Sequence, residues 1–248
     1  MKKMIVITGV NGGIGSAIAT HFLDKGYAVL GLDLQPTAKI KLDAFISVNL
    51  ADVVGSCELR AHLGQQINDF VTEKNVVLSA LVNNAAVQIL DGVDTVTMDD
   101  FLMTQTINVA APLMLSQLCL PKMQAGEAVI VNIGSIHATL TKPGFISYAT
   151  SKAAIKGLTQ AMAVDLAGRA TVNCIEPAAV ATEMLVDGFR AAPEKLKDLG
   201  DCHPSGRIGT PDEVAELCYF LIDTNVKFLN GASIGLNGAI AARLHDVV

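Results

Sequence analysis

Two residues of this sequence form a pair that could move a proton. Tyr148 and Lys152 stand in a Y-x-x-x-K pattern, and residues four apart lie on the same face of a helix. A free tyrosine, with a pKa near ~10, is a poor acid–base group at neutral pH, but a cation held nearby favours its phenolate form. The pattern alone is also common on exposed helices. We expect Tyr148 to act as an acid and base that Lys152 tunes.

A third candidate, Ser135, stands thirteen residues before Tyr148, at the exit of an apolar run over residues 128–133. Ligands bind at the carboxyl ends of strands in open α/β sheets, so a hydroxyl group there would hold a substrate oxygen against the phenol. A serine after a strand is more often a turn residue or a helix cap. His137, two residues further on, either lines the same pocket or lies in a surface loop.

A glycine-rich turn predicts a site for a dinucleotide. Glycines occupy positions 9, 12, 13 and 15, between an apolar run at 4–8 and a helical pattern at 13–25. Gly9 permits a tight turn, while Gly13 and Gly15 let a pyrophosphate approach the free N–H groups and positive dipole end of the helix. Asp33 follows Gly15 by 18 residues, where a carboxylate binds the ribose hydroxyl groups.

The position of Asp33 also bears on the choice of cofactor. A carboxylate there would repel the 2′-phosphate of NADP, and no Arg or Lys occupies positions 10, 11 or 34 to neutralise that phosphate. NAD is therefore the expected cofactor. Lys39 and Lys41 are close enough in sequence to keep NADP as the alternative.

Alternating strands and helices must position these residues. Apolar, β-branched runs predict strands at 4–8, 28–33, 44–48, 78–83, 128–133, 171–175 and 232–236, and helical periods cover 13–25, 55–74, 98–124, 148–168 and 211–221. This alternation predicts a doubly wound sheet or an eight-stranded barrel, and the glycine turn after the first strand favours the doubly wound, Rossmann-like sheet with helices on both faces. Without a linker or repeat, residues 1–248 are expected to form a single domain. Within it, segment 183–205 is expected to form a helical flap that covers a substrate.

Composition excludes several classes of protein. The chain has 248 residues with 24 Asp+Glu against 18 Lys+Arg, and this acidic balance argues against binding to nucleic acid. No apolar run approaches the ~20 residues that span a bilayer. The five widely spaced cysteines lack a C-x-x-C pair, which is typical of a reduced, cytoplasmic protein. The five histidines show no metal-ligand spacing, so no metal site is expected.

Taken together, these motifs resemble the short-chain dehydrogenase/reductase family over essentially the whole chain. The resemblance rests on the order and spacing of Gly9, Gly13, Gly15, Asn83, Asn84, Ala85, Ala86, Asn108, Ser135, Tyr148, Lys152, Pro177 and Thr182. It implies a mostly parallel seven-stranded sheet and hydride transfer between a nicotinamide cofactor and an alcohol or carbonyl carbon. Ala86 and Ala178 depart from the family pattern, because each replaces a usual glycine near the cofactor.

The resemblance also implies a role for each site residue. Tyr148 would be the general acid and base, Ser135 would orient the substrate oxygen, and Lys152 would hold the nicotinamide ribose. Asn108 would hold a water that links Lys152 to solvent. The residues expected to bind the cofactor are Gly9, Asn11, Gly12, Gly13, Ile14, Gly15, Asp33, Leu34, Asn49, Leu50, Asn84, Ala85, Ala86, Tyr148, Lys152, Pro177, Val180 and Thr182.

The substrate is expected to be a small polar secondary alcohol or the corresponding ketone. Candidate contacts are Ser135, His137, Gln88, Tyr148, Met184 and Leu185, with ordinary helix packing as the alternative for the last two. Family members pair their long helices across two-fold axes, so a homotetramer or homodimer is implied. Two rival functions stay open: an NADPH-dependent carbonyl reductase of biosynthesis, and a dinucleotide-binding regulator without catalysis.

Overall fold

The computed structural model describes residues 1–190 and 192–244, together with the side chains of these residues except that of Met184. In this part of the chain, seven parallel strands form one sheet in the order β3-β2-β1-β4-β5-β6-β7. The strands are β1 Lys2–Thr8, β2 Ala28–Asp33, β3 Ala44–Ser47, β4 Val76–Asn83, β5 Ala128–Ile133, β6 Ala170–Pro177 and β7 Ser233–Leu236. The doubly wound sheet that the sequence predicts is confirmed.

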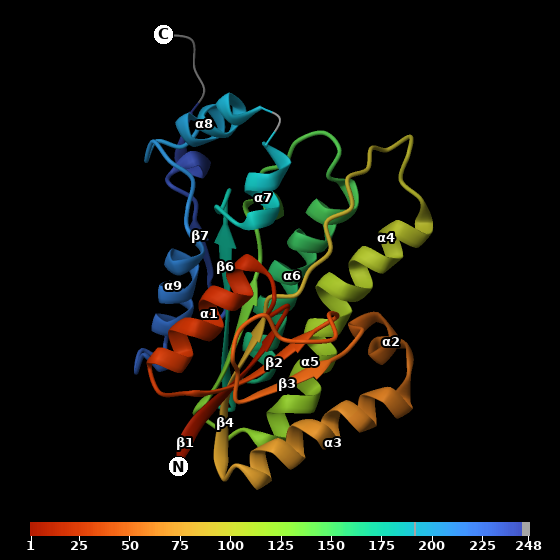
Figure 1. Cartoon of the computed structure of the whole chain (residues 1–248), viewed down its shortest axis with the longest axis vertical. Helices are drawn as coiled ribbons and strands as arrows, with labels where there is room; N and C mark the ends of the chain where they lie inside the picture. The colour runs from red at the N-terminus through yellow and green to blue at the C-terminus, as the bar shows by residue number, and fades with distance from the viewer. Residues whose placement is uncertain (191, 245–248) are drawn as a thin grey trace.

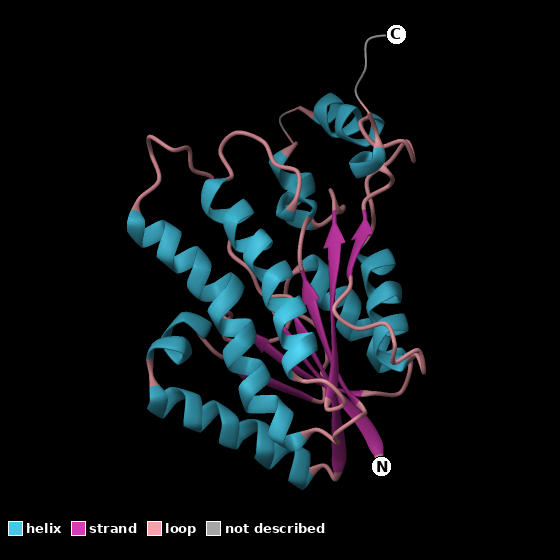
Figure 2. Cartoon of the chain, turned by 180° about the vertical axis from the view of Figure 1, so that it is seen from behind, coloured by secondary structure: helices cyan, strands magenta, loops and turns pink. Residues whose placement is uncertain are grey.

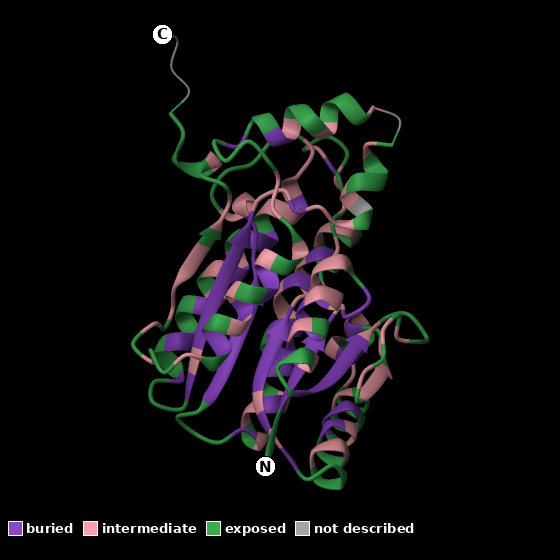
Figure 3. Cartoon of the chain, turned by 60° about the vertical axis from the view of Figure 1, so that its left-hand side comes forward, coloured by how far each residue is buried: buried purple, intermediate pink, exposed green. Residues whose placement is uncertain are grey.

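The central strands are mostly apolar and buried, since helices cover both faces of the sheet (Figures 2 and 3). Side chains of α1 (Gly13–Asp24) and α9 (Pro211–Asp223), such as Ile18, Phe22 and Val214, pack on one face. Side chains of α3 (Cys57–Glu73), α5 (Ala111–Cys119) and α6 (Ile146–Asp165) pack on the other. Because all the strands are parallel, their carboxyl ends lie at one edge of the sheet.

Two of the predicted helical segments match helices of the structure but contain features that the sequence did not predict. The helix predicted at 55–74 corresponds to α3, and a short unpredicted helix, α2 (Leu50–Gly55), ends just before it. Ser56 separates the two helices with an extended backbone, and its hydroxyl caps α3 by accepting from the Leu59 N–H at 3.2 Å. The segment predicted as one helix at 98–124 contains α4 (Met98–Gln105), a π-helical turn η1 (Thr106–Ala110) and α5, and a 3-10 turn η2 (Leu120–Lys122) follows.

The described residues of segment 183–205 are largely helical and lie at the carboxyl edge of the sheet. It contains α7 (Glu183–Gly188) and α8 (Pro193–Asp201), which lie above the ends of β6 and β7 in Figure 1. The short turns η3 (Ile136–Ala138) and η4 (Ile240–Ala242) complete the elements. In the part of the chain that the structure describes, every helix is too short or too polar to cross a membrane.

Candidate active site

The start of α6 places Tyr148 and Lys152 on one face of the helix, as the spacing predicts. The Lys152 ammonium lies 5.4 Å from the centroid of the Tyr148 ring. This lysine is only 4% exposed, and its Nζ donates to the carbonyl oxygen of Ile133 at 2.8 Å. Because Ile133 ends β5, this hydrogen bond holds the ammonium and the tyrosine ring at the carboxyl edge of the sheet.

Ser135 follows β5 at the same edge and is 7% exposed. Its Oγ accepts from the backbone N–H of His137 at 3.2 Å, so the residue caps η3. The His137 ring in turn packs edge-on against the Tyr148 ring, with 5.8 Å between centroids. The cap and the ring contact together tie the Ser135 turn to the first turn of α6. The Ser135 hydroxyl hydrogen is left to donate to a ligand oxygen.

Asn108 connects the site to the loop after β4. Its side-chain amide donates to the Val87 carbonyl at 2.9 Å and accepts from the Val87 N–H at 2.8 Å. The same amide donates to Ser151 Oγ at 2.9 Å, and Ser151 donates to the Tyr148 carbonyl at 2.7 Å. These bonds use both N–H hydrogens of the Asn108 amide, so this side chain has no hydrogen left to donate to another group.

Asp91, which no sequence motif singles out, holds the start of α6. Asp91 is 6% exposed, and its carboxylate accepts from both the N–H (3.1 Å) and the hydroxyl of Ser147, the residue before Tyr148. Its backbone N–H also donates to the Gly144 carbonyl at 3.0 Å. The contact joins residues 56 apart in the sequence, so no local pattern indicates it. Asp91 supplies a negative charge at a helix N-terminus that has no cap of its own.

The glycine turn has the close packing that a pyrophosphate site requires. A Cβ atom on Gly15 would lie 2.1 Å from the Gly9 carbonyl oxygen, and Gly9 itself has a φ of +63°. The first turn of α1 has neither a side-chain cap nor an acidic residue, so its N–H groups and positive dipole end stay free for an anion. Asn84 supports this turn from β4, because its side-chain amide donates to the carbonyls of Thr8 and Gly9 at 2.9 and 3.1 Å.

Asp33 lies beside this turn in a fixed orientation. One carboxylate oxygen accepts from the Asn11 N–H at 2.9 Å, and the other accepts from the Gln35 N–H at 3.0 Å. The Asn11 amide also bonds the backbone of Thr37 and Lys39. The carboxylate at the end of β2 is therefore held by two backbone N–H groups. The pyrophosphate turn and this anchored carboxylate together fit an adenine dinucleotide.

The remaining predicted residues differ in their contacts and in how far they are buried. Thr182 caps α7 and packs against Gly13, because a Cβ atom on this glycine would lie 3.0 Å from the Thr182 Cβ. Pro177 and Val180 are buried at the end of β6, and Leu185 is half-buried on α7. Gln88, Ala86, Leu34 and Asn49 are exposed, whereas Leu50 is buried at the start of α2. Met184 lies on α7, but its side chain is outside the described residues.

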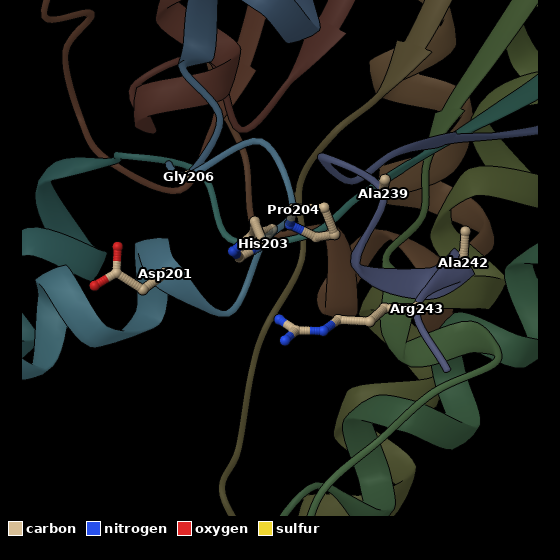
Figure 4. Close-up of a pocket in the computed structure, with 7 residues that line it drawn as sticks. All are labelled: Asp201, His203, Pro204, Gly206, Ala239, Ala242 and Arg243. Atoms are coloured by element: carbon tan, nitrogen blue, oxygen red, sulfur yellow. The ribbon is translucent and has the colours of Figure 1, made fainter. Parts of the chain in front are cut away.

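A cavity of about 510 Å³ lies elsewhere, between α8 and the C-terminal segment (Figure 4). Asp201, His203 and Pro204 line it from segment 183–205, and the Arg243 side chain extends toward them from the other side. None of the predicted catalytic or cofactor-binding residues lines this cavity. Among the described residues, no group of three or more His, Cys, Asp and Glu side chains is arranged to hold a metal ion.

Comparisons with known proteins agree with this geometry. A family model described as enoyl-(acyl carrier protein) reductase, of the short-chain dehydrogenase type, matches residues 9–238. The chain is 31% identical to 2-(R)-hydroxypropyl-CoM dehydrogenase of Xanthobacter autotrophicus, over 98% of this chain and 100% of that protein. The structure of the aldohexose dehydrogenase of Thermoplasma acidophilum matches with a TM-score of 0.89 and 26% identity, over 100% of this chain and 97% of that one.

A second structure, ElxO with NADP bound, matches with a TM-score of 0.86 and 26% identity, over 98% of this chain and 100% of that one. The family model, the relatives and the matched structures cover nearly the whole chain, including the glycine turn, Ser135, Tyr148 and Lys152. This protein is an oxidoreductase with a site for a nicotinamide dinucleotide, and it belongs to the short-chain dehydrogenase/reductase family.

Proposed function

We propose that this chain is an NAD-dependent dehydrogenase that interconverts a small polar secondary alcohol and its ketone. The observation that carries the proposal is the contact of the buried Lys152 ammonium with the Tyr148 ring, 5.4 Å from its centroid, at the sheet edge that also holds Ser135. A bound nicotinamide ring supplies the hydride acceptor in oxidation and the donor in reduction. The residues of this chain bind, orient and exchange the proton.

Tyr148 is the group assigned to proton exchange. In alcohol oxidation its phenolate oxygen takes the hydroxyl proton of the substrate, and in ketone reduction its phenol returns that proton. The Lys152 ammonium is buried, is held by the Ile133 carbonyl and lies beside the Tyr148 ring. Its positive charge stabilises the negative charge that the phenolic oxygen carries while the proton is exchanged. Ser135 donates its hydroxyl hydrogen to the same substrate oxygen, because its Oγ already accepts from the His137 N–H.

The π-helical turn suggests how the proton reaches solvent. Pro112 lies four residues after Asn108 and has no N–H, so the Asn108 carbonyl lacks its usual helical donor. We propose that the Asn108 carbonyl binds a water molecule, and that this water links Lys152 to solvent. The side-chain amide of Asn108 instead donates to the Val87 carbonyl and to Ser151, and so connects the loop after β4 with α6.

The cofactor is assigned to the turn at residues 9–15 and to Asp33. The free N–H groups at the start of α1 bind the pyrophosphate, and the Asp33 carboxylate binds the adenosine ribose hydroxyls. The other residues assigned to the cofactor are those named above, with Thr182 at the carboxamide end. The nearby Lys39, whose backbone N–H donates to the Asn11 side chain, has its exposed ammonium 3.8 Å from the Glu183 carboxylate. The preference for NAD therefore rests on Asp33.

An alcohol panel tests the proposed function directly. Purified protein with NAD should reduce the cofactor with at least one small secondary alcohol, measured by absorbance of NADH. Cofactor binding without turnover on any alcohol or ketone would instead favour a dinucleotide-binding regulator. Turnover that requires NADPH would favour the reductase of biosynthesis.

Substituting Asp33 with Asn should reduce discrimination against NADP. The amide keeps an oxygen for one of the two backbone N–H groups but removes the charge that opposes a 2′-phosphate. We expect the ratio of kcat/KM for NAD to that for NADP to fall by about tenfold or more, since like charges a few ångströms apart cost about 1–4 kcal/mol. Asp24→Ala, at the exposed far end of α1, is the control. An unchanged ratio in Asp33→Asn would contradict the ribose contact.

Substituting Asp91 with Ala should impair catalysis without removing a site residue. The change leaves the N–H and hydroxyl of Ser147 unpaired in a buried position, which costs about 1–3 kcal/mol of stability, and frees the turn that carries Tyr148. We expect kcat to fall while the Kd for NADH changes little. Asp91→Asn, which keeps one acceptor, should restore part of the kcat, and Asp94→Ala in the same loop is the exposed control. Equal kcat in the Asp91 and Asp94 alanine variants would refute this role.

We also propose that the chain forms a homo-oligomer, a homotetramer or homodimer. Exposed apolar side chains lie along α4, α5 and α6: Met98, Leu102, Met103, Leu113 and Val164. Apolar patches of this kind mark interaction surfaces. Light scattering of the purified protein measures its mass, and a monomer at micromolar concentration would refute the proposal.

A further inference from the structure

The Tyr148 ring is one of three aromatic rings that pack together as a wall at the start of α6. The His137 ring stacks on the Phe145 ring, with 4.4 Å between centroids and an angle of 7° between planes. Tyr148 meets both rings edge-on, at 5.8 Å from His137 and 6.1 Å from Phe145. We call these three residues and Lys142 the His137 cluster. A substrate whose oxygen lies at Tyr148 would extend along this wall.

The cluster carries a positive charge without an acidic partner among the described residues. The Lys142 ammonium lies 4.8 Å from the centroid of the Phe145 ring, a cation–π contact that keeps it beside the wall. None of the ion pairs in the described part of the chain involves Lys142. The neighbouring Lys156, by contrast, pairs with Glu176 at 3.5 Å. Lys142 therefore keeps its charge available for a ligand.

The His137 ring presents one further hydrogen-bonding group. Its Nδ1 lies 3.1 Å from Thr141 Oγ1, so Nε2 is the ring nitrogen left for a ligand. Burial, and secondly the charge of Lys142, lower the pKa of His137, which favours the neutral ring at neutral pH. When the Thr141 hydroxyl donates to Nδ1, the neutral ring carries its proton on Nε2 and donates from there.

We propose that the substrate carries an anionic oxygen group, such as a carboxylate, which Lys142 and His137 bind while the carbinol oxygen lies between Tyr148 and Ser135. This inference rests on the proposed function and narrows its substrate class. An ammonium binds an anionic oxygen through a charge-assisted hydrogen bond, which is stronger than a neutral one. The same ammonium would repel a cationic substrate, and a neutral alcohol would bind at Tyr148 and Ser135 without a group that pairs with Lys142.

Matched substrates test the charge requirement. For the wild-type protein with NAD, we expect kcat/KM for 3-hydroxybutyrate to exceed that for its neutral analogue 2-butanol by about 10- to 100-fold, the range that corresponds to a hydrogen bond with a charged group. A third probe, 3-hydroxybutyl phosphate, shows whether a carboxylate or a phosphate is the better anion. Equal or better turnover of 2-butanol would overturn the inference and leave the proposed function intact.

Substitutions of Lys142 test whether the preference for an anionic substrate comes from the His137 cluster. Lys142→Gln should reduce the ratio of kcat/KM for the anionic substrate to that for 2-butanol by about tenfold or more, and Lys142→Arg should retain most of the ratio. Lys25→Gln is the matched control, because Lys25 lies over the Tyr219 ring at 5.3 Å, at the other end of α1 from the glycine turn. An unchanged ratio in Lys142→Gln would also overturn the inference.

A binding experiment decides the case in which none of these alcohols is oxidised. Butyrate and methyl phosphate are titrated calorimetrically into the protein loaded with NADH, for the wild type and for Lys142→Gln. Saturable binding that Lys142→Gln weakens by about tenfold supports the anion site even where turnover, and with it the proposed function, fails. Binding that is absent, or equal in both proteins, refutes the site.

Discussion

Replacing Tyr148 with Phe should lower the turnover of the alcohol by about 10²–10⁴-fold, the usual contribution of general acid–base catalysis. The substitution removes only the phenolic oxygen. The ring stays in contact with Lys152, His137 and Phe145, so the start of α6 and the surrounding wall should keep their structure. The Kd for NADH should therefore remain near that of the wild type, and the loss should appear in kcat.

The experiment needs both a rate and a binding constant. Stopped-flow reduction of NAD measures the rate, and quenching or enhancement of NADH fluorescence measures binding. Tyr219→Phe is the matched control, because it removes a phenol that bonds Asp223 at 3.0 Å on α9, away from the sheet edge that holds the site. Full turnover by Tyr148→Phe would remove this residue from its assigned role. If NADH affinity fell by the same factor as the rate, Tyr148 would have a structural role and no role in proton transfer.

Replacing Gly15 with Ala should disable the cofactor site and destabilise the protein. The added Cβ atom would lie 2.1 Å from the Gly9 carbonyl oxygen and 2.8 Å from the Asn84 side-chain nitrogen. Neither neighbour can move freely, because Asn84 bonds the backbone of Thr8 and Gly9. Overpacking of this kind costs about 1–3 kcal/mol, and relief requires the turn to move away from the start of α1.

We expect the affinity of Gly15→Ala for NADH to fall by about tenfold or more, together with a lower Tm. Gly55→Ala is the control, because a Cβ atom on this exposed α2 glycine meets no atom within 4 Å and its backbone is not left-handed. That variant should be neutral or more stable by about 0.5–1 kcal/mol. Wild-type affinity in Gly15→Ala would show that the turn does not hold the cofactor.

The strands were the part of the fold that sequence patterns predicted best. Each of the seven predicted runs overlaps an observed strand, with differences confined to a few residues at the ends. A strand that is covered on both faces is mostly apolar, so it appears as a nearly continuous hydrophobic run. Features that interrupt or precede the helices were predicted less well. The helical period gave no sign of the π-helical turn before Pro112, and it did not indicate α2 as a separate helix before Ser56.

Local motifs indicated the residues that could do chemistry, and contacts across the sheet edge showed how they are held. The Y-x-x-x-K spacing by itself predicts that Tyr148 and Lys152 share a helix face. It cannot predict that the Lys152 ammonium bonds the Ile133 carbonyl, or that Asp91 bonds Ser147 from a loop 56 residues away. The side chain of Asn108 is a similar case, because its partners Val87 and Ser151 lie on different segments.

By itself, the sequence determined the α/β class, the phosphate turn, and the identity of the candidate proton-transfer group. Each of these depends on backbone conformation and residue spacing over a few positions. Only the tertiary structure decided that Asp33 is held by two backbone N–H groups and that Lys142 and His137 share an aromatic wall with the phenol. The orientation of these side chains and the charge around them depend on which side chains meet where loops from separate strands lie at one edge of the sheet. Those contacts form only when the chain is packed.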